Sequence, residues 1–347
     1  MRYFVSLLMS CFLLTSTWAQ IEKVGTSGKK CYEKLDSRRG KQFVDWECGK
    51  VIGVVDCNEK LEYDEGSNTF FSKGTGSPFS GQCETCHRNG IRERVVTFVN
   101  GKENGPDTTT YYDGCIMVIR NHINGKEHGK WTYFYDSTQY TAWEINYNNG
   151  IKNGVSLYLS PEGDTTLYEN YIGGLLTGQR KTYYAGGKIE KITTYAKGIM
   201  NGPFTVYNKE GKQLQNLTYK NGQKNGVAYY YYDDGTLMRT ENWLSGIQNG
   251  EFKTVYYDGT LQSLENYVKG LKEGWFEERY NDQKLKRKAL YKKDVLVIDH
   301  VYDKEGNEVY TFGAQPTSDF EDDQMPAPSA GKKDKKQKEK KKKTKGE

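Results

Sequence analysis

The sequence predicts an all-β fold, an elongated single-layer array of about nine β-hairpin repeats of 24 residues, with an N-terminal cap stapled by disulfides. Three observations predict it. Glycine recurs with a fixed period, Asn-Gly and Asp-Gly turns stand between strand-like runs, and one position of the period is aromatic in almost every copy. Composition agrees, because 38 glycines and 28 tyrosines with only 7 prolines fit neither a helical bundle nor collagen nor a disordered chain.

The glycine period is the sign of a repeat array. Nine framework glycines are separated by 24 residues, with a single step of 25. A second glycine follows nine residues later in seven of the nine units, and a third closes eight of them. The framework positions are Gly81, Gly105, Gly129, Gly154, Gly178, Gly202, Gly226, Gly250 and Gly274.

The turn dipeptides predict where each hairpin reverses. Asn89-Gly90 and Asp234-Gly235 are examples of sequences that tolerate positive φ, and we expect two-residue hairpin turns there and at residues 113–114 and 258–259. The flanking runs are rich in Tyr, Thr, Val, Phe and Trp, as strands are. Closing segments such as residues 221–226 supply the return turn to the next hairpin.

One position of the period predicts a ladder of rings along one face of the sheet. A lone hairpin is barely stable, so each unit must pack on its neighbours. His122 occupies this position in the second unit. The aromatic members are Phe98, Tyr147, Tyr171, Tyr195, Tyr219, Trp243, Tyr267 and Tyr291.

The repeat units resemble the bacterial variant of the MORN repeat (membrane occupation and recognition nexus). The resemblance rests on units such as GPFTVYNKEGKQL at residues 202–214 and GVAYYYYDDGTL at 226–237, and it covers about residues 79–294. It implies β-hairpin arrays that serve as scaffolds or binding surfaces. Some bacterial members are antitoxin components, and eukaryotic members are associated with membranes and partner proteins.

The N-terminus predicts export. Arg2 precedes an apolar run over residues 4–14, and small residues at Thr17 and Ala19 predict cleavage before Gln20. Lipidation of Cys11 is the alternative. Eleven apolar residues are too few for a membrane span, which needs about 20, so no transmembrane segment is expected. We expect a signal peptide at 1–19, a cap at 20–78, repeats at 79–294, a capping hairpin at 295–313, and a disordered linker and Lys-rich tail at 314–347.

The mature chain keeps six cysteines, all before residue 116. An even number in an exported protein predicts disulfides, although six cysteines allow fifteen pairings. Cys83, Cys86 and His87 also match the CxxCH spacing of haem attachment, and zinc through the two cysteines is a further alternative. We expect disulfides, and neither cofactor nor metal. The six candidates are Cys31, Cys48, Cys57, Cys83, Cys86 and Cys115.

No catalytic motif stands out among the four histidines and the turn carboxylates, so we expect a protein that is not an enzyme. The tyrosine-rich strands are the candidate binding surface for a protein or a cell-envelope polymer, with a cross-strand packing ladder as the alternative. An immunity or antitoxin-like role and a c-type haem carrier are the other functions to weigh. The binding candidates are Tyr133, Tyr135, Tyr184, Tyr230, Tyr232 and Tyr256.

Charge is concentrated in the tail. Residues 331–347 hold ten lysines against three acidic residues, whereas the whole chain has a net charge of +5. The body is therefore slightly acidic, and no nucleic acid is expected as a partner. The tail predicts attraction to an anionic surface of the periplasm, cell envelope or extracellular space.

Overall fold

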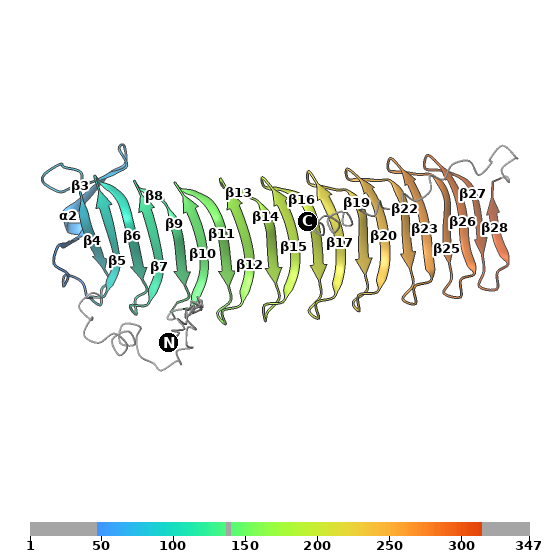
Figure 1. Cartoon of the computed structure of the whole chain (residues 1–347), viewed down its shortest axis with the longest axis horizontal. Coiled ribbons are helices and arrows are strands. Elements are labelled where there is room, and N and C mark those ends of the chain that lie inside the picture. The colour runs from blue at the N-terminus through green and yellow to red at the C-terminus, as the bar shows by residue number, and fades with distance from the viewer. Residues whose placement is uncertain (1–46, 137–139, 314–347) are drawn as a thin grey trace, which may run out of the picture. The chain divides into compact units, whose positions relative to one another are not determined.

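The computed structural model describes residues 47–136 and 140–313, and within these ranges the protein is almost entirely β-structure (Figure 1). The expected all-β array of consecutive hairpins is confirmed. Of the strands in the described ranges, 26 belong to one sheet, and β2 and β3 form a separate two-stranded sheet. Two compact units divide the chain, Met1–Gly187 and Lys188–Glu347.

The first unit contains one short helix and the first fourteen strands. Its elements are β1 (Val54–Asp56), α2 (Cys57–Lys60), β2 (Leu61–Asp64), β3 (Thr69–Ser72), β4 (Gly81–Cys86), β5 (Arg92–Val99), β6 (Lys102–Thr110), β7 (Ile116–Ile123), β8 (Lys126–Glu127), β9 (Gly129–Phe134), β10 (Thr141–Asn148), β11 (Ile151–Leu159), β12 (Thr165–Ile172), β13 (Leu175–Leu176) and β14 (Gly178–Tyr183).

The second unit contains the remaining fourteen strands, again paired antiparallel in chain order. They are β15 (Ile189–Ala196), β16 (Ile199–Tyr207), β17 (Gln213–Lys220), β18 (Gln223–Lys224), β19 (Gly226–Tyr231), β20 (Leu237–Leu244), β21 (Ile247–Gln248), β22 (Gly250–Val255), β23 (Leu261–Val268), β24 (Leu271–Lys272), β25 (Gly274–Arg279), β26 (Leu285–Lys292), β27 (Val295–Tyr302) and β28 (Glu308–Phe312).

The return turn that closes each repeat is the two-residue hairpin turn. Between β17 and β18, Asn221 has φ 50° and Gly222 has φ 80°, and Lys220 pairs with Gln223 across the turn. Two consecutive residues with positive φ make a type I′ turn, whose twist matches that of the flanking strands. Asn and Gly adopt this conformation at low cost, which explains their place here.

The Asp-Gly turns at the other edge are three-residue loops, so the expectation of two-residue turns there was wrong. The Tyr232 amide donates to the Thr236 carbonyl at 2.9 Å, and the Gly235 amide donates to the Tyr232 carbonyl at 2.9 Å. Gly235 has φ 88° and ends a type I turn, the usual three-residue hairpin loop. Both loop types favour Asp-Gly, and here the Asp234 carboxylate accepts a hydrogen bond from the Thr236 amide at 2.9 Å.

Neighbouring return turns within a unit are tied together. The Gly222 amide donates to the Met200 carbonyl at 2.8 Å, and the Asn221 amide donates to the side-chain carbonyl of Asn201 at 3.2 Å. Each such acceptor stands immediately before a framework glycine. This pair of residues therefore belongs to the repeat framework and also holds the next return turn through a hydrogen bond. The same side-chain contact recurs with the acceptors Asn104, Asn153, Asn225, Asn249 and Glu273.

The buried side chains lie in cross-strand pairs on the face that carries the aromatic ladder, which we call the aromatic face. Trp131 pairs with Ile145, and Phe204 pairs with Leu217. Both partners on the second strand are almost inaccessible, at 5% for Ile145 and 3% for Leu217. A one-layer sheet thus buries a narrow core because each residue is covered by the strands on either side.

The N-terminal end of the first unit is covered by the cap. Strand β1 pairs parallel with β4, and disulfides join Cys57 to Cys83 and Cys48 to Cys86. The prediction of disulfides is confirmed for these four cysteines, and Cys115 is disulfide-bonded as well. Leu61, Phe70 and Phe79 pack with Phe98 into a small core of the cap. Cys31 lies outside the described residues.

The last hairpin is formed by β27 and β28 around a loop in which the Asp303 amide donates to the Asn307 carbonyl at 2.9 Å. This is the hairpin expected at 295–313. The expected signal peptide, the cap residues before 47, and the linker and Lys-rich tail at 314–347 lie outside the described residues. In the described part of the chain, no helix has the length and apolarity that a membrane crossing requires.

Candidate functional site

The aromatic face carries a continuous ladder of rings in the second unit. Ring centroids of successive neighbours lie 5.6, 4.9, 5.7 and 4.8 Å apart, all edge to face. This geometry suits the ring quadrupoles and adds stability beyond the buried area. The expected ladder is therefore present, and it is interleaved with aromatic residues from the intervening strands. Its members in order are Trp243, Phe252, Tyr267, Phe276 and Tyr291.

Lysines lie over this ladder. Lys224 Nζ is 4.6 Å from the centroid of the Trp243 ring, and Lys272 Nζ is 4.8 Å from that of Tyr291. Burial acts to lower the pKa of Lys224, but its hydrogen bond to the Tyr230 hydroxyl and the nearby Glu241 carboxylate raise that pKa above its usual value. The two lysines cover the ring faces, which makes the centre of this face a packed surface.

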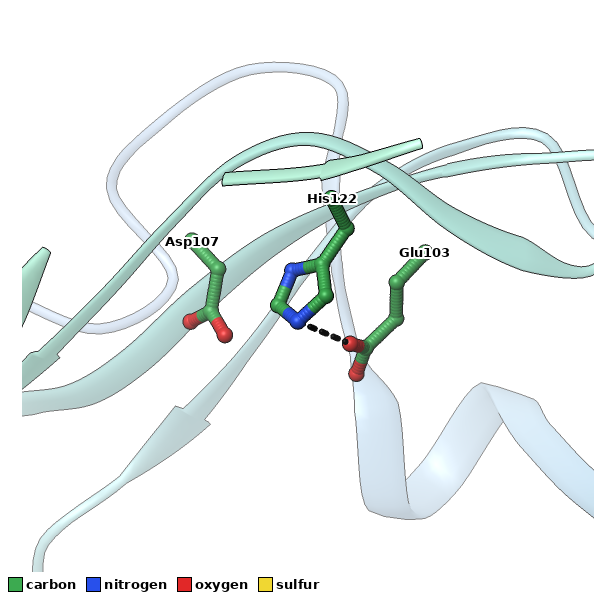
Figure 2. A group of neighbouring side chains, drawn as sticks. All are labelled: Glu103, Asp107 and His122. Carbon is green, nitrogen blue, oxygen red and sulfur yellow. Dashed lines mark ion pairs between the residues drawn. The ribbon is translucent and has the colours of Figure 1, made fainter. Parts of the chain in front are cut away.

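A charged cluster in the first unit brings Glu103, Asp107 and His122 together (Figure 2). The two carboxylates come from β6 and the imidazole from β7. His122 Nε2 lies 3.3 Å from a Glu103 carboxylate oxygen, and Asp107 is completely buried. His122 takes the aromatic position of its repeat and packs edge to face on Trp131 at 5.3 Å. The residue types and spacing are those that could hold a metal ion.

The surrounding arginines do not fit a metal. Arg94 donates through two nitrogens to the two Asp107 oxygens, at 3.0 and 2.8 Å, and through one nitrogen to Glu103 at 2.6 Å. Arg120 adds a contact of 2.8 Å to Asp107. A cation would have to displace these bonds and sit beside two guanidinium charges. The cluster is a charge-balanced network that holds three strands together.

The tyrosines expected to bind a partner are mostly engaged within the sheet. Tyr135 donates to the Leu159 carbonyl at 2.6 Å, and Tyr256 donates to the Arg279 carbonyl at 2.6 Å. Tyr232 makes the same bond to the next repeat, at 2.9 Å to the Val255 carbonyl. These hydroxyls tie the loop end of one hairpin to the strand end of the following hairpin, and the loops at Tyr232 and Tyr256 contain Asp-Gly.

The other tyrosine candidates also lie in contacts. The Tyr133 ring stacks on Trp143 with centroids 3.5 Å apart. The Tyr230 hydroxyl donates to Glu241 at 2.9 Å. Tyr184 is half-buried and also has a partner. The six tyrosines therefore take part in packing and hydrogen bonding, and they do not form an exposed strip together.

The CxxCH segment is part of the cap. Cys83 and Cys86 belong to two different disulfides, and His87 Nε2 lies 3.1 Å from the Thr110 carbonyl oxygen. Haem attachment needs both sulfurs for thioether bonds, and zinc needs both as thiolates. With both sulfurs oxidised, neither alternative fits this segment.

The exposed apolar surface lies elsewhere, beside the return turns and on the face opposite the ladder. The residue before each turn and the residue after it pair across the strands, as Leu244 does with Ile247 and Val268 with Leu271. We call these side chains the aliphatic row. They are 39–64% exposed, and the members are Val99, Ile123, Ile151, Ile172 and Leu175 in the first unit and Ile199, Leu244, Ile247, Val268, Leu271 and Val295 in the second.

Members of the aliphatic row reach along the unit to the next turn. A Cβ placed on Gly270 would lie 3.2 Å from the Ile247 methyl, and one on Gly174 would lie 3.0 Å from that of Ile151. The row is therefore continuous from Leu244 to Leu271, whereas the polar pair Lys220 and Gln223 interrupts it between Ile199 and Leu244. The sequence contains a pattern for this row, because aliphatic residues recur two positions before and one position after the closing glycine. The aromatic pattern at the adjacent position is stronger and hides this aliphatic pattern.

No family model matches the chain, and no curated protein matches it. Among solved structures, it is similar to TcdB2-TccC3, with 12% identity over 70% of this chain and a TM-score of 0.18. It is also similar to the Tc holotoxin pore of Photorhabdus luminescens with the TccC3-D651A mutation, with 11% identity over 73% of this chain and a TM-score of 0.16. The chain spans about 16% of the length of each of these proteins.

Proposed function

We propose that the protein is an exported, non-enzymatic scaffold of MORN-like repeats that binds a protein partner at the cell envelope through the surface of its β-hairpin array. The observation that carries the proposal is the aliphatic row. Leu244, Ile247, Val268 and Leu271 expose 41–57% of their surface on adjacent hairpins. Contiguous exposed apolar residues are a mark of interaction sites, whereas isolated ones are ordinary.

The chemistry of the row favours a protein over a glycan. Aliphatic side chains gain stability by removing apolar area from water and offer no hydrogen bonds to sugar hydroxyls. The aromatic rings that could stack on a sugar are packed edge to face on the opposite side, with lysines over them. Disulfides in the cap support an oxidising compartment, in keeping with the signal peptide that the sequence predicts.

The test compares capture of envelope components by the intact protein and by two variants. Leu244→Gln with Ile247→Gln makes one segment of the row polar. Leu237→Gln is the matched control, because Leu237 is 40% exposed but lies at the opposite edge of the hairpin, next to an Asp-Gly loop. We expect the double variant to lose a captured component that the control retains.

Protease treatment of the envelope fraction distinguishes the partner classes. A protein partner disappears after digestion, whereas an envelope polymer remains. Equal capture by the double variant and the control would contradict the role of the row, and capture that survives protease would replace the protein partner with a polymer.

A further inference from the structure

The last strand of the second unit presents an open edge. Strand β28 pairs with β27, and no other strand pairing is present for it among the described residues. All five of its residues are exposed, with Val309 at 61%, Tyr310 at 52% and Phe312 at 48%. Natural sheets usually protect such edges with several charged residues, proline, bulges or a covering element, whereas β28 has one charged residue, Glu308, and one bulge, at Val309.

The register of the repeat shows that this edge lacks its usual neighbour. Phe312 pairs with Asp299, Asp299 with Ala289, and Ala289 with Phe276, so Phe312 lies on the aromatic face in line with the core. Ala289, which occupies the same place one repeat earlier, is 1% exposed because strands lie on both sides of it. Phe312 is covered on one side only. In the repeat pattern, a further strand would pair with the free edge of β28 and cover Phe312.

In the first unit, the first strand of the repeats is covered by the cap. Strand β1 pairs with β4, and Phe70 of the cap packs on Phe98 with ring centroids 4.8 Å apart. A head-to-tail chain of copies would need an open edge at both ends. A pairing of two last strands needs no second open edge, and such an isologous contact closes after two copies.

We propose that β28 is a homodimer interface, in which two copies pair their last strands antiparallel about Tyr310 and continue one sheet across the two-fold axis. This register sets Tyr310 opposite Tyr310, Val309 opposite Thr311, and Glu308 opposite Phe312. Aromatic and β-branched pairs are favourable cross-strand neighbours, and no two like charges are directly opposed. Main-chain hydrogen bonds supply affinity in strand addition, while the side chains supply specificity.

The chain's own C-terminal segment is a poorer occupant by its sequence. Pro316 follows closely after β28, and the next residues include the acidic run Asp319-Phe320-Glu321-Asp322-Asp323. Laid along β28, that run would bring carboxylates near Glu308 and offers one large apolar side chain. A five-residue strand pair is a small interface, so we expect a dimer that dissociates on dilution.

The experiment measures the mass of the full-length mature protein by sedimentation across a concentration series. We expect the mass to rise from one chain to two. Tyr310→Lys places two lysines opposite each other on the axis and should weaken the dimer by at least about tenfold. Tyr112→Lys is the matched control, because Tyr112 is 60% exposed and lies far away in the chain, and it should dimerise like the wild type.

Charge complementation tests the register. A mixture of Tyr310→Lys and Tyr310→Glu should restore dimers that neither variant forms alone, because the axis would then hold opposite charges. Circular dichroism checks that each variant keeps the β-fold. A wild type that stays monomeric at every concentration, or a Tyr310→Lys variant that dimerises like the control, overturns the proposal. Dimers that form only after removal of residues 314–347 also overturn it, and they would identify the chain's own end as the occupant.

Discussion

Individual glycines in this protein are required for two reasons at once, backbone conformation and space. Gly202 has φ 123°, a region that side chains rarely adopt, and a Cβ there would lie 3.0 Å from the Thr194 methyl. The same crowding occurs at Gly154 and Gly250, where an added Cβ would lie 3.3 and 3.1 Å from a side chain of the preceding strand. At Gly178, Gly226 and Gly274 no atom lies within 4 Å, so glycine is required there by its positive φ alone.

Replacing Gly202 should destabilise the protein clearly. Gly202→Ala is expected to lower the free energy of unfolding by roughly 1–3 kcal/mol, because it forces alanine into a strained conformation. Gly66→Ala is the control, since Gly66 has no positive φ and its nearest contact would be 3.7 Å away. Urea unfolding of both variants measures the difference, and equal midpoints would contradict the requirement.

Two tyrosines of the ladder are held protonated to high pH. Burial first, and then a hydrogen bond to the Glu169 carboxylate at 2.9 Å, raise the pKa of Tyr171 to about 12. Tyr267 has the same arrangement with Glu265 at 2.8 Å, and its pKa is also raised to about 12. Because the folded pKa exceeds the ordinary value of 10.0, the stabilising contribution is complete below pH 10 and is lost as the pH rises through about 12.

Absorbance titration of tyrosinate measures this directly. The wild type should show a fraction of its tyrosines ionising near pH 12, and Glu265→Gln should move Tyr267 toward the ordinary range because the accepting carboxylate loses its charge. Glu251→Gln is the control, since Glu251 is exposed and lies on the opposite face of the same hairpin. An unchanged titration curve for Glu265→Gln would show that the hydrogen bond is not the cause.

At the scale of elements, the network around Asp107 joins β5, β6 and β7. Asp107→Asn keeps the shape of the side chain but leaves Arg94 and Arg120 facing a neutral group in a buried place. We expect a loss of roughly 3 kcal/mol, since removing one partner of a buried pair leaves a charge uncompensated. Glu278→Gln is the matched control, because its contact with Lys286 is exposed and should contribute less than about 1 kcal/mol. Comparable losses in both variants would contradict this account.

The cap depends on its cross-links more than the repeats do. The Cys57–Cys83 disulfide closes a segment of 26 residues, and such a loop stabilises by about 3.5 kcal/mol in the chain-entropy account. Replacing both cysteines with serine should lower the unfolding midpoint and make residues 47–80 the first site of proteolysis. A double cysteine variant whose cap resists protease as well as the wild type would show that the small apolar core suffices.

The strands, the turns and the ladder positions can largely be predicted from the sequence, because the repeat fixes all three together. The period predicts the return turns and the aromatic face, and the even number of cysteines after the expected signal peptide predicts the disulfides. The loop at Gly235 was misread because Asp-Gly serves two loop types. The Asp107 network escaped prediction because its members are spread over residues 94–122 and meet only when the strands pair.

The exposed aliphatic row was the hardest feature to predict, for a related reason. Tyrosine is conspicuous in the sequence, yet Tyr135, Tyr232 and Tyr256 use their hydroxyls to join successive hairpins. An aliphatic residue such as Ile247 is ordinarily assigned to a core. Only the strand register places it on the outer side of a turn, where a one-layer sheet has no second layer to cover it.

At the scale of the whole molecule, the chain combines a nearly neutral body with a strongly basic end. Residues 331–347 carry a net charge of +7, with ten lysines and no aromatic or aliphatic residue. Ten lysines close together in the sequence attract an anionic surface electrostatically. We expect this segment to act as an electrostatic tether to anionic lipid headgroups or acidic polysaccharide of the envelope.

A variant without the tail tests whether membrane binding depends on the tail and folding does not. Near an anionic membrane each lysine contributes about 1 kcal/mol, and the attraction fades beyond a Debye length of about 8 Å at physiological salt. Truncation after Ala330 should leave the thermal unfolding transition unchanged and abolish binding to vesicles that contain anionic lipid. The full-length protein should bind these vesicles at low salt and release them as salt rises, and it should ignore neutral vesicles. If the truncated protein binds equally well, or if binding is insensitive to salt, the attraction belongs to the folded repeats and the tail is not a tether.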